Sequence, residues 1–168
     1  KQGVPIDGIG VQGHSYLETF DRRELIRCLD SLAIFKLPLR ITEFNLPGMR
    51  SKYKQSQLTP EQEVAKAKEI VDFYSICFAH PSVEGILMWG FWEGANWIPS
   101  SSLYKRDWTP TPAAGAYHDL VYREWWTKVS GTAGRKGRFT TPAFYGKYRI
   151  TVNGVSKEVD LTKEKGKA

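Results

Sequence analysis

LRITEFNLPG, residues 39–48, joins a short apolar run to a carboxylate and then to a turn. The run from Leu39 to Ile41, bounded by a turn signal, is typical of a buried strand. The predicted strand is LRITEF (39–44), which carries Thr42 and Glu43 near its end, and the Asn-Leu-Pro-Gly that follows favours a turn. A carboxylate at the end of a buried strand is costly unless a partner or a function requires it. Glu43 is therefore the first candidate for chemistry in this chain.

Two more apolar runs predict strands before and after this one. IDGIGVQGH (6–14) predicts a strand at about residues 8–13, and ILMWGF (86–91) predicts another. Helix-start signals follow the three strands, at Asp21 with Glu24, at Thr59 with Pro60 and Gln62, and at Thr111 with Pro112. This alternation of strands and helices predicts a parallel sheet covered by helices. Because parallel strands end at a common edge, the residues that follow them are expected to meet there.

The buried faces of the first two helices are predicted from apolar residues at three- and four-residue steps. These residues are Leu25, Cys28, Leu29, Leu32 and Phe35 in the first helix, and Val64, Ala67, Val71, Tyr74 and Phe78 in the second. Cys28 and Cys77 lack metal-ligand spacing, so we expect both to be small buried hydrophobic side chains.

The pattern changes near residue 130, where apolar and polar residues begin to alternate with a period of two. Asn153-Gly154 within this stretch is a strong signal for a β-hairpin. We therefore expect one domain of alternating strands and helices at 1–129 and a β-rich C-terminal appendage at 130–168. The last residues, TKEKGKA, are expected to form a disordered tail.

The composition of the 168 residues, 41% hydrophobic and 25% charged, predicts a globular chain with room for one sizeable domain. A net charge of +6 invites a nucleic-acid interpretation, but no recognition motif accompanies it, so none is expected. No apolar run is long enough to cross a membrane. His14, His80 and His118 are scattered, which argues against zinc, and no cofactor is expected.

Tryptophans cluster after the third apolar run, in MWGFWEGANWIP (88–99). Tryptophan clusters usually belong to a core, but three indoles in one glycine-containing loop, namely Trp89, Trp92 and Trp97, are difficult to bury together. Flat indole faces stack against sugar rings, and the polar side chains that could then bind sugar hydroxyls are Gln12, Glu93 and Asn96. An aromatic platform beside a carboxylate is what a carbohydrate cleft requires. The alternative is that Glu43 simply pairs with Arg40 or with a helix N-terminus.

GIGVQGH, ITEFN and GILMWGFWEGANWIP, in this order, resemble the closing part of family 10 glycoside hydrolases, the retaining endo-1,4-β-xylanases. The likeness covers about residues 3–126. It implies an α/β fold, the C-terminal part of a TIM (β/α)8 barrel with strands six to eight, followed by the small antiparallel β appendage.

The resemblance also implies roles for individual residues. Glu43 resembles the catalytic nucleophile, and His14 resembles the imidazole that orients it. The residues that resemble substrate contacts are Gln12, Trp89 and Trp97, with Glu93 as a possible contact at the rim. Asn45 stands where an aspartate commonly follows the nucleophile, which weakens any expectation of a supporting hydrogen bond there. His80 and His118 are expected to have no part in the chemistry.

A retaining glycosidase needs a second carboxyl group as acid/base, about 5–5.5 Å from the nucleophile. The family's acid/base follows an asparagine at the end of strand four, and this chain has no strand four. We therefore expect the chain to belong to a longer polypeptide, to need a complementary chain that supplies the N-terminal part of the barrel, or to self-associate. By itself it is expected to be inactive.

The expected substrate is xylan or a related plant polysaccharide, and the family implies an extracellular location, although no signal peptide is visible. Two other interpretations stay open. In one, the chain is a non-catalytic carbohydrate-binding protein or an inactive barrel fragment, in which the tryptophans form a sugar platform without turnover. In the other, the chain is a scaffold and its β appendage is an interaction module.

Overall fold

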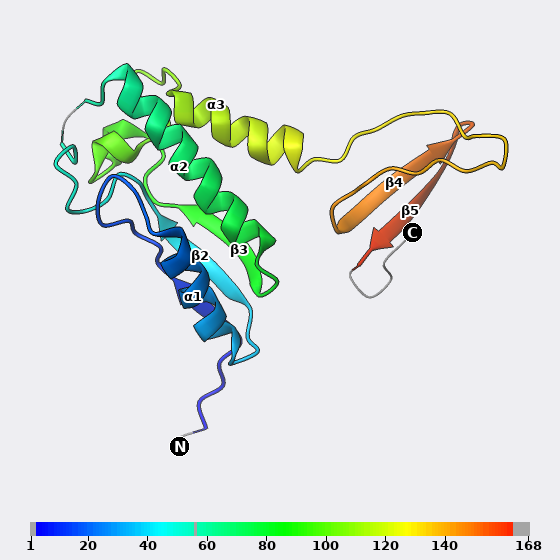
Figure 1. The fold of residues 1–168 in the computed structure, drawn as a ribbon, viewed down its shortest axis with the longest axis horizontal. Helices are drawn as coiled ribbons and strands as arrows, with labels where there is room; N and C mark the ends of the chain where they lie inside the picture. Colours follow the sequence, from blue (N-terminus) through cyan, green and yellow to red (C-terminus); the bar gives the residue numbers. More distant parts are fainter. Residues whose placement is uncertain (1–2, 56, 163–168) are drawn as a thin grey trace. The chain divides into compact units, whose positions relative to one another are not determined.

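The computed structural model describes residues 3–55 and 57–162, which form two compact units (Figure 1). The first unit ends at His118 and the second begins at Asp119. The predicted domain boundary at residue 129 was placed by composition and stays a prediction. Among the described residues, no helix combines the length and the apolar character needed to cross a lipid bilayer.

The first unit is built on a parallel sheet in the order β1-β2-β3. Its strands are β1 (Ile9–Val11), β2 (Leu39–Phe44) and β3 (Val83–Met88). Val11 pairs with Ile41 and Phe44 pairs with Met88, so the three strands end side by side. The predicted parallel arrangement is confirmed.

The third strand lies earlier in the chain than predicted. It was expected at 86–91 and is found at Val83–Met88. Gly90 has a φ of +74°, in the left-handed region that favours glycine, and this turn ends the extended backbone. The shift brings Trp89 to the first position after the strand, where its N–H donates to the carbonyl of Phe44 at 2.9 Å.

Helices α1 (Arg22–Ala33) and α2 (Pro60–Ala79) lie side by side over the sheet, and α3 (Pro112–Asp119) follows the loop after β3 (Figure 1). The capping box predicted at α2 is present in both directions. Gln62 N–H donates to Thr59 Oγ1 at 3.4 Å, and Thr59 N–H donates to Gln62 Oε1 at 2.8 Å. At α1, Asp21 accepts from two backbone amides of the first turn, but Glu24 pairs with Arg27 instead of completing a box.

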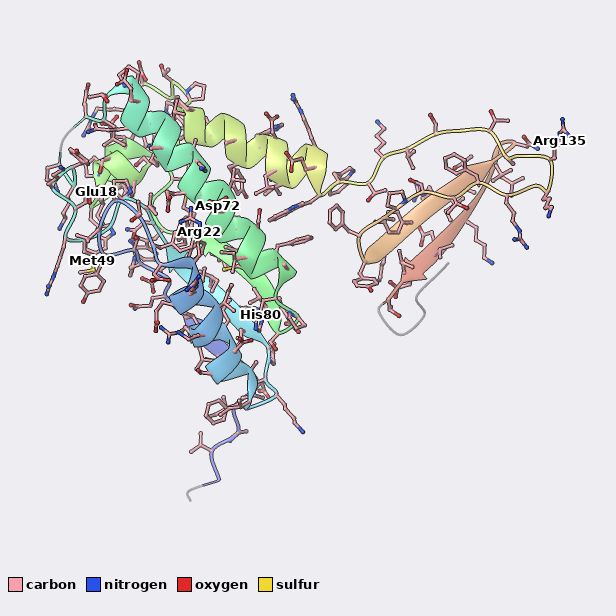
Figure 2. The ribbon with its side chains drawn as sticks, in the orientation of Figure 1. Glu18, Arg22, Met49, Asp72, His80 and Arg135 are labelled. Atoms are coloured by element: carbon pink, nitrogen blue, oxygen red, sulfur yellow. The ribbon has the colours of Figure 1, made fainter. Side chains whose placement is uncertain are left out.

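An arginine joins the two helices. Arg22 extends from the start of α1 towards α2 and lies beside Asp72 (Figure 2). Its Nε donates to Asp72 Oδ2 at 3.1 Å and its Nη2 donates to Glu69 Oε1 at 3.0 Å. These partners raise the pKa of the Arg22 guanidinium, so it stays charged. The two helices are therefore tied at their exposed edge as well as through the core.

The core lies between β2 and α2. Phe44 stacks on Phe73 with ring centroids 3.9 Å apart, and Ile41 and Ile70 are completely buried. Much of the fold's stability comes from this apolar contact, since burial of a large side chain contributes about 1.5–3 kcal/mol.

The predicted buried face of α2 was partly wrong. Ala67 and Tyr74 are buried, but Val64 and Phe78 are 62% and 44% exposed. The true face includes the charged pair Glu63 and Lys66, which neutralise each other in the interior. An apolar pattern counts such residues as exposed and so places the face incorrectly.

The two cysteines differ. Cys77 is completely buried on α2, as predicted, and burial raises the pKa of its thiol to about 12. Cys28 is exposed on α1, which contradicts the prediction. In α1 only Leu29 is buried, because the helix rests on the sheet along a narrow contact.

The second unit contains a π-helical turn (Leu120–Glu124) and a hairpin of β4 (Gly146–Val152) and β5 (Val155–Leu161). Asn153 and Gly154 form its turn with φ values of 49° and 81°. One face of the hairpin is mostly apolar but includes Lys157, which lies opposite Ile150, and the other carries the cross-strand pairs Lys147–Asp160, Arg149–Glu158 and Thr151–Ser156. The disordered tail predicted at 162–168 falls almost entirely on residues 163–168, which lie outside the described residues.

Candidate active site at the carboxyl ends of the strands

Backbone hydrogen bonds bring the ends of the three strands together. Glu43 N–H donates to the carbonyl of Gln12 at 2.8 Å, and Ser15 N–H donates to the carbonyl of Asn45 at 3.2 Å. Trp89 is joined to Phe44 in the same way. Residues separated by about thirty positions in the sequence are thus fixed at one edge of the sheet by main-chain atoms, which makes their relative positions independent of side-chain rotamers.

Glu43 and His14 form the centre of this edge. His14 Nε2 lies 3.1 Å from Glu43 Oε2, and the two side chains are 14% and 28% exposed. The carboxylate is therefore held by a hydrogen bond while part of its surface stays open. The alternative partner Arg40 lies elsewhere, with its guanidinium 4.0 Å from Glu84.

Asn45 supports the imidazole from its other side. Its side chain is buried, and its Oδ1 lies 3.1 Å from His14 Nδ1. Little in the sequence led us to expect a supporting hydrogen bond at this position, but the structure has one, because an amide can bond a ring nitrogen. Asn45 is thus a site residue that sequence reasoning undervalued, although its spacing from Glu43 was visible.

Trp97 contacts this centre, and Trp89 follows the end of the neighbouring strand β3. Trp97 meets His14 edge to face, with ring centroids 5.6 Å apart and planes at 78°. Trp97 and Trp89 are 41% and 48% exposed, so both present indole surface to solvent. Trp92 belongs to a different group, since it stacks on Trp108 at 5.2 Å and donates from Nε1 to the carbonyl of Arg106.

Asn96 is not available for a sugar hydroxyl, contrary to expectation. It is buried, and its Nδ2 donates to the hydroxyls of Ser101 and Ser102 at 3.0 and 2.8 Å and to the carbonyl of Gly90. Its Oδ1 accepts from Ile98 N–H at 3.0 Å. Asn96 therefore shapes the loop that carries Trp97.

The structure places the two remaining candidates at the periphery. Gln12 is exposed at the end of β1, and its carbonyl is the acceptor for Glu43 N–H. Glu93 lies in a 3-10 turn (Glu93–Ala95), where its Oε2 accepts from Arg106 N–H at 2.8 Å. One oxygen of Glu93 is thus already used within the loop, which leaves its sugar contact a prediction.

A basic loop, residues 50–55, lines the outer side of Trp97, a contact that was not predicted from the sequence. Lys54 Nζ lies over the Trp97 ring, 5.2 Å from its centroid. Gln55 Nε2 donates to the Trp97 carbonyl at 3.3 Å, and Ser100 Oγ donates to the Lys54 carbonyl at 3.2 Å. The alternation of lysine and tyrosine in RSKYK was the sequence signal available for such a contact between a basic loop and an aromatic ring.

A buried lysine anchors the Trp97 loop from below. Lys66 Nζ donates to the carbonyls of Ser100 and Ser102 at 3.1 and 3.0 Å and lies 2.7 Å from Glu63 Oε2. Burial lowers the pKa of the Lys66 amine, and the neighbouring Glu63 carboxylate opposes this effect. The loop is thus held by an ionic network that reaches through α2.

An apolar pocket of about 380 Å³ lies behind His14, between the β1–α1 connection and α1. Its lining includes Phe20, Leu25 and Phe73, and neither Glu43 nor Trp97 takes part. Ser15, Thr19, Asp21 and Glu24 also border it, but it includes neither the Glu43 carboxylate nor the exposed tryptophans, so the exposed edge at Glu43 is the better candidate site. Among the described residues, no group of three or more His, Cys, Asp or Glu side chains is placed to hold a metal ion.

Comparison with known protein families gives one match over most of the chain. The model of glycosyl hydrolase family 10 matches residues 1–120. The sequence is 39% identical over 153 residues to anti-sigma-I factor RsgI6 of Acetivibrio thermocellus, an alignment covering 90% of this chain and 18% of that protein. It is 28% identical to endo-1,4-beta-xylanase 1 of Arabidopsis thaliana, covering 90% of this chain and 14% of that protein.

Solved structures give the same result for the fold. The chain superposes on native xylanase 10B of Thermotoga maritima with a TM-score of 0.61 at 25% identity, over 73% of this chain and 39% of that one. Xylanase 10B of Thermotoga petrophila, solved in complex with xylobiose, also gives 0.61, over 38% of its length. The chain therefore spans less than two fifths of these structures and less than a fifth of the curated relatives.

Proposed function

This chain belongs to glycosyl hydrolase family 10, and from that premise we propose that it forms strands six to eight of a TIM barrel that hydrolyses internal β-1,4 linkages in xylan or a related plant polysaccharide. The single observation that carries the proposal is the position of the Glu43 carboxylate, held by His14 Nε2 at 3.1 Å at a partly open strand end. Ligands of barrel enzymes bind at this end of the strands.

In the proposed mechanism, Glu43 is the nucleophile of a double displacement. One carboxylate oxygen attacks the anomeric carbon, the glycosidic bond breaks, and the leaving oxygen takes a proton from an acid/base. Water, deprotonated by the same acid/base, then attacks the glycosyl–enzyme ester and releases Glu43. The hydrogen bond from His14 keeps the attacking oxygen in place, which lowers the entropy cost of attack.

Trp89 and Trp97 would form the walls of the sugar site. Trp97 contacts His14, and Trp89 follows the end of β3 next to Phe44; both indoles are exposed. The Lys66 and Asn96 contacts hold the Trp97 loop in place. Gln12 would bind a hydroxyl from the end of β1, and Glu93 would contact the substrate at the rim. A rigid aromatic wall limits the entropy lost on binding.

The proton donor is proposed to lie outside these residues. Glu84 follows the start of β3, at the opposite end of the sheet from Glu43, and Glu93 is engaged by Arg106 N–H. The missing part would be the N-terminal remainder of the barrel or a complementary chain, pairing with the edges of β1 and β3. An extracellular location follows from the polymeric substrate and is part of this proposal.

The test uses an aryl β-xylobioside whose leaving group departs without protonation. It is given to the chain alone and to the chain completed by the N-terminal part of a barrel, each with Glu43→Gln as the isosteric variant and Glu84→Gln, at the opposite end of the sheet, as the matched control. We expect aryl release that Glu43→Gln abolishes and Glu84→Gln preserves. Equal release by the Glu43→Gln variant would remove Glu43 from the mechanism.

A second candidate function is carbohydrate binding without turnover. It is favoured by the 39% identity to a protein named as an anti-sigma factor, which exceeds the 28% identity to the plant xylanase. In that case Trp89 and Trp97 would hold a glycan for recognition. Binding of xylo-oligosaccharide with no aryl release by any form of the protein would favour this function over hydrolysis.

A further inference from the structure

The side-chain amide of Asn45 is buried beside His14, and its Nδ2 group is unpaired. Its Oδ1 faces His14 Nδ1, while its Nδ2 is buried and has no hydrogen-bond partner among residues 3–55 and 57–162. A buried N–H without an acceptor is rare in folded proteins and more costly than a carbonyl without a donor. The orientation of this amide therefore helps to determine which ring nitrogens of His14 carry a proton.

The protons of His14 are constrained from the other side by Glu43. A carboxylate only accepts, so Nε2 must carry a proton to bond Glu43 Oε2 at 3.1 Å. Two states of the ring satisfy this condition. In the cation, Nδ1 also carries a proton and needs an acceptor; in the neutral ring, Nδ1 has a lone pair and needs a donor.

Asn45 can supply either partner, because a half-turn about its last side-chain bond exchanges Oδ1 and Nδ2. After the half-turn, Nδ2 occupies the position 3.1 Å from Nδ1 and donates one N–H to it, so the buried nitrogen gains an acceptor and the carbonyl takes the unpartnered position. An aspartate at this position could only accept, and would require the proton on Nδ1. The choice of Asn over Asp thus decides which forms of His14 can be fully hydrogen-bonded.

The charged groups near the ring come from several elements. Glu43 on β2 contacts Nε2, Lys54 lies over the Trp97 ring that meets His14, and Asp21 and Glu24 line the same pocket as His14. The hydrogen bond at Nδ1 is that of Asn45, so the buried amide is the group whose own hydrogen bonding differs between the two states.

We infer that Asn45 is a positioning residue that holds His14 as the neutral tautomer with its proton on Nε2, by donating from Nδ2 to Nδ1. Glu43 then receives a directed hydrogen bond without a cation beside it and keeps its full negative charge. The benefit to a nucleophilic Glu43 rests on the proposed function, whereas the proton assignment rests only on the contacts above.

The experiment is nitrogen-15 NMR of the imidazole rings in the labelled, unmodified chain near neutral pH. We expect His14 to show one protonated nitrogen, Nε2, and one unprotonated nitrogen, Nδ1. His80 serves as the internal reference, since its Nδ1 accepts from Ser82 N–H at 3.3 Å and so must also be unprotonated. A doubly protonated His14, or a proton on Nδ1 alone, overturns the inference.

Asn45→Asp supplies the complementary test. In this variant both nitrogens of His14 should be protonated at the pH where the unmodified ring is neutral, with the His80 signals unchanged. A neutral Nε2–H ring that persists in Asn45→Asp shows that the amide does not set the tautomer. If this variant does not fold, the spectrum of the unmodified chain decides by itself, and neither result depends on whether the protein hydrolyses xylan.

Discussion

Replacement of Lys66 by methionine tests whether the ionic network beneath the Trp97 loop stabilises the fold. The Lys66 side chain is 3% exposed, and its ammonium bonds two loop carbonyls at 3.0–3.1 Å and faces Glu63 at 2.7 Å. Methionine fills the same space, so no cavity cost is expected. The loss is therefore that of the charge and its hydrogen bonds.

The expected cost follows from what the substitution leaves unpaired. Breaking a buried ion pair typically costs about 3–5 kcal/mol, because the remaining charge stays buried. Here Lys105 Nζ still lies 2.9 Å from Glu63 Oε1, so the carboxylate keeps one partner. We therefore expect Lys66→Met to lower the free energy of unfolding of the first unit by about 3 kcal/mol, at the lower end of that range.

The measurement is urea denaturation followed by tryptophan fluorescence, with amide hydrogen exchange of Ser101 and Ser102 as the local readout. Both amides are bonded within the loop, so they should exchange faster in Lys66→Met. Lys68→Met is the matched control, since Lys68 is exposed on the same helix and should change stability by less than about 0.5 kcal/mol. A loss below about 1 kcal/mol in Lys66→Met would refute a stabilising role for the network.

Three further predictions concern the fold around the site. Burial raises the pKa of the Cys77 thiol from 9.0 to about 12, so the thiol ionises first in the unfolded chain. The free energy of unfolding should therefore fall as the pH rises above 9.0, by up to about 1.4 kcal/mol per pH unit. Urea denaturation at several pH values should show this fall in the unmodified chain and not in Cys77→Ala. A Cβ on Gly48 would lie 1.9 Å from the Ser15 carbonyl oxygen, so Gly48→Ala should lower the melting temperature markedly. Gly115→Ala is the control: a Cβ on Gly115 in α3 meets open space, so this substitution should raise the melting temperature slightly. Thr59→Ala removes the cap of α2 and should cost about 1 kcal/mol in chemical denaturation, and an unchanged midpoint would show that the capping box is not needed.

Features set by local sequence were predicted well. The strand Leu39–Phe44 has the predicted bounds, because an apolar run followed by Asn-Leu-Pro-Gly determines both of its ends. The start of α2 at Pro60 also has the predicted capping box, since all its partners lie within one turn of the helix. The edge shared by His14 and Glu43 followed from the order of strands and helices alone.

Features set by contacts between distant residues were not predicted. The buried face of α2 includes Glu63 and Lys66, whose burial depends on loop carbonyls far along the chain. Asn96 was assigned to sugar binding because its contacts with the serines of its own loop leave no pattern in the sequence. Asn45 was undervalued since only coordinates show that its amide reaches His14.

Covalent trapping tests the central claim, that Glu43 is the nucleophile of a retaining glycosidase. The protein is incubated with a 2-fluoro-xylobioside that carries an activated leaving group, digested, and examined by mass spectrometry. The account predicts a fluoro-xylobiosyl group on the peptide that contains Glu43, and none in the Glu43→Gln variant. Turnover without a label on Glu43, or a label on another carboxylate, would contradict it.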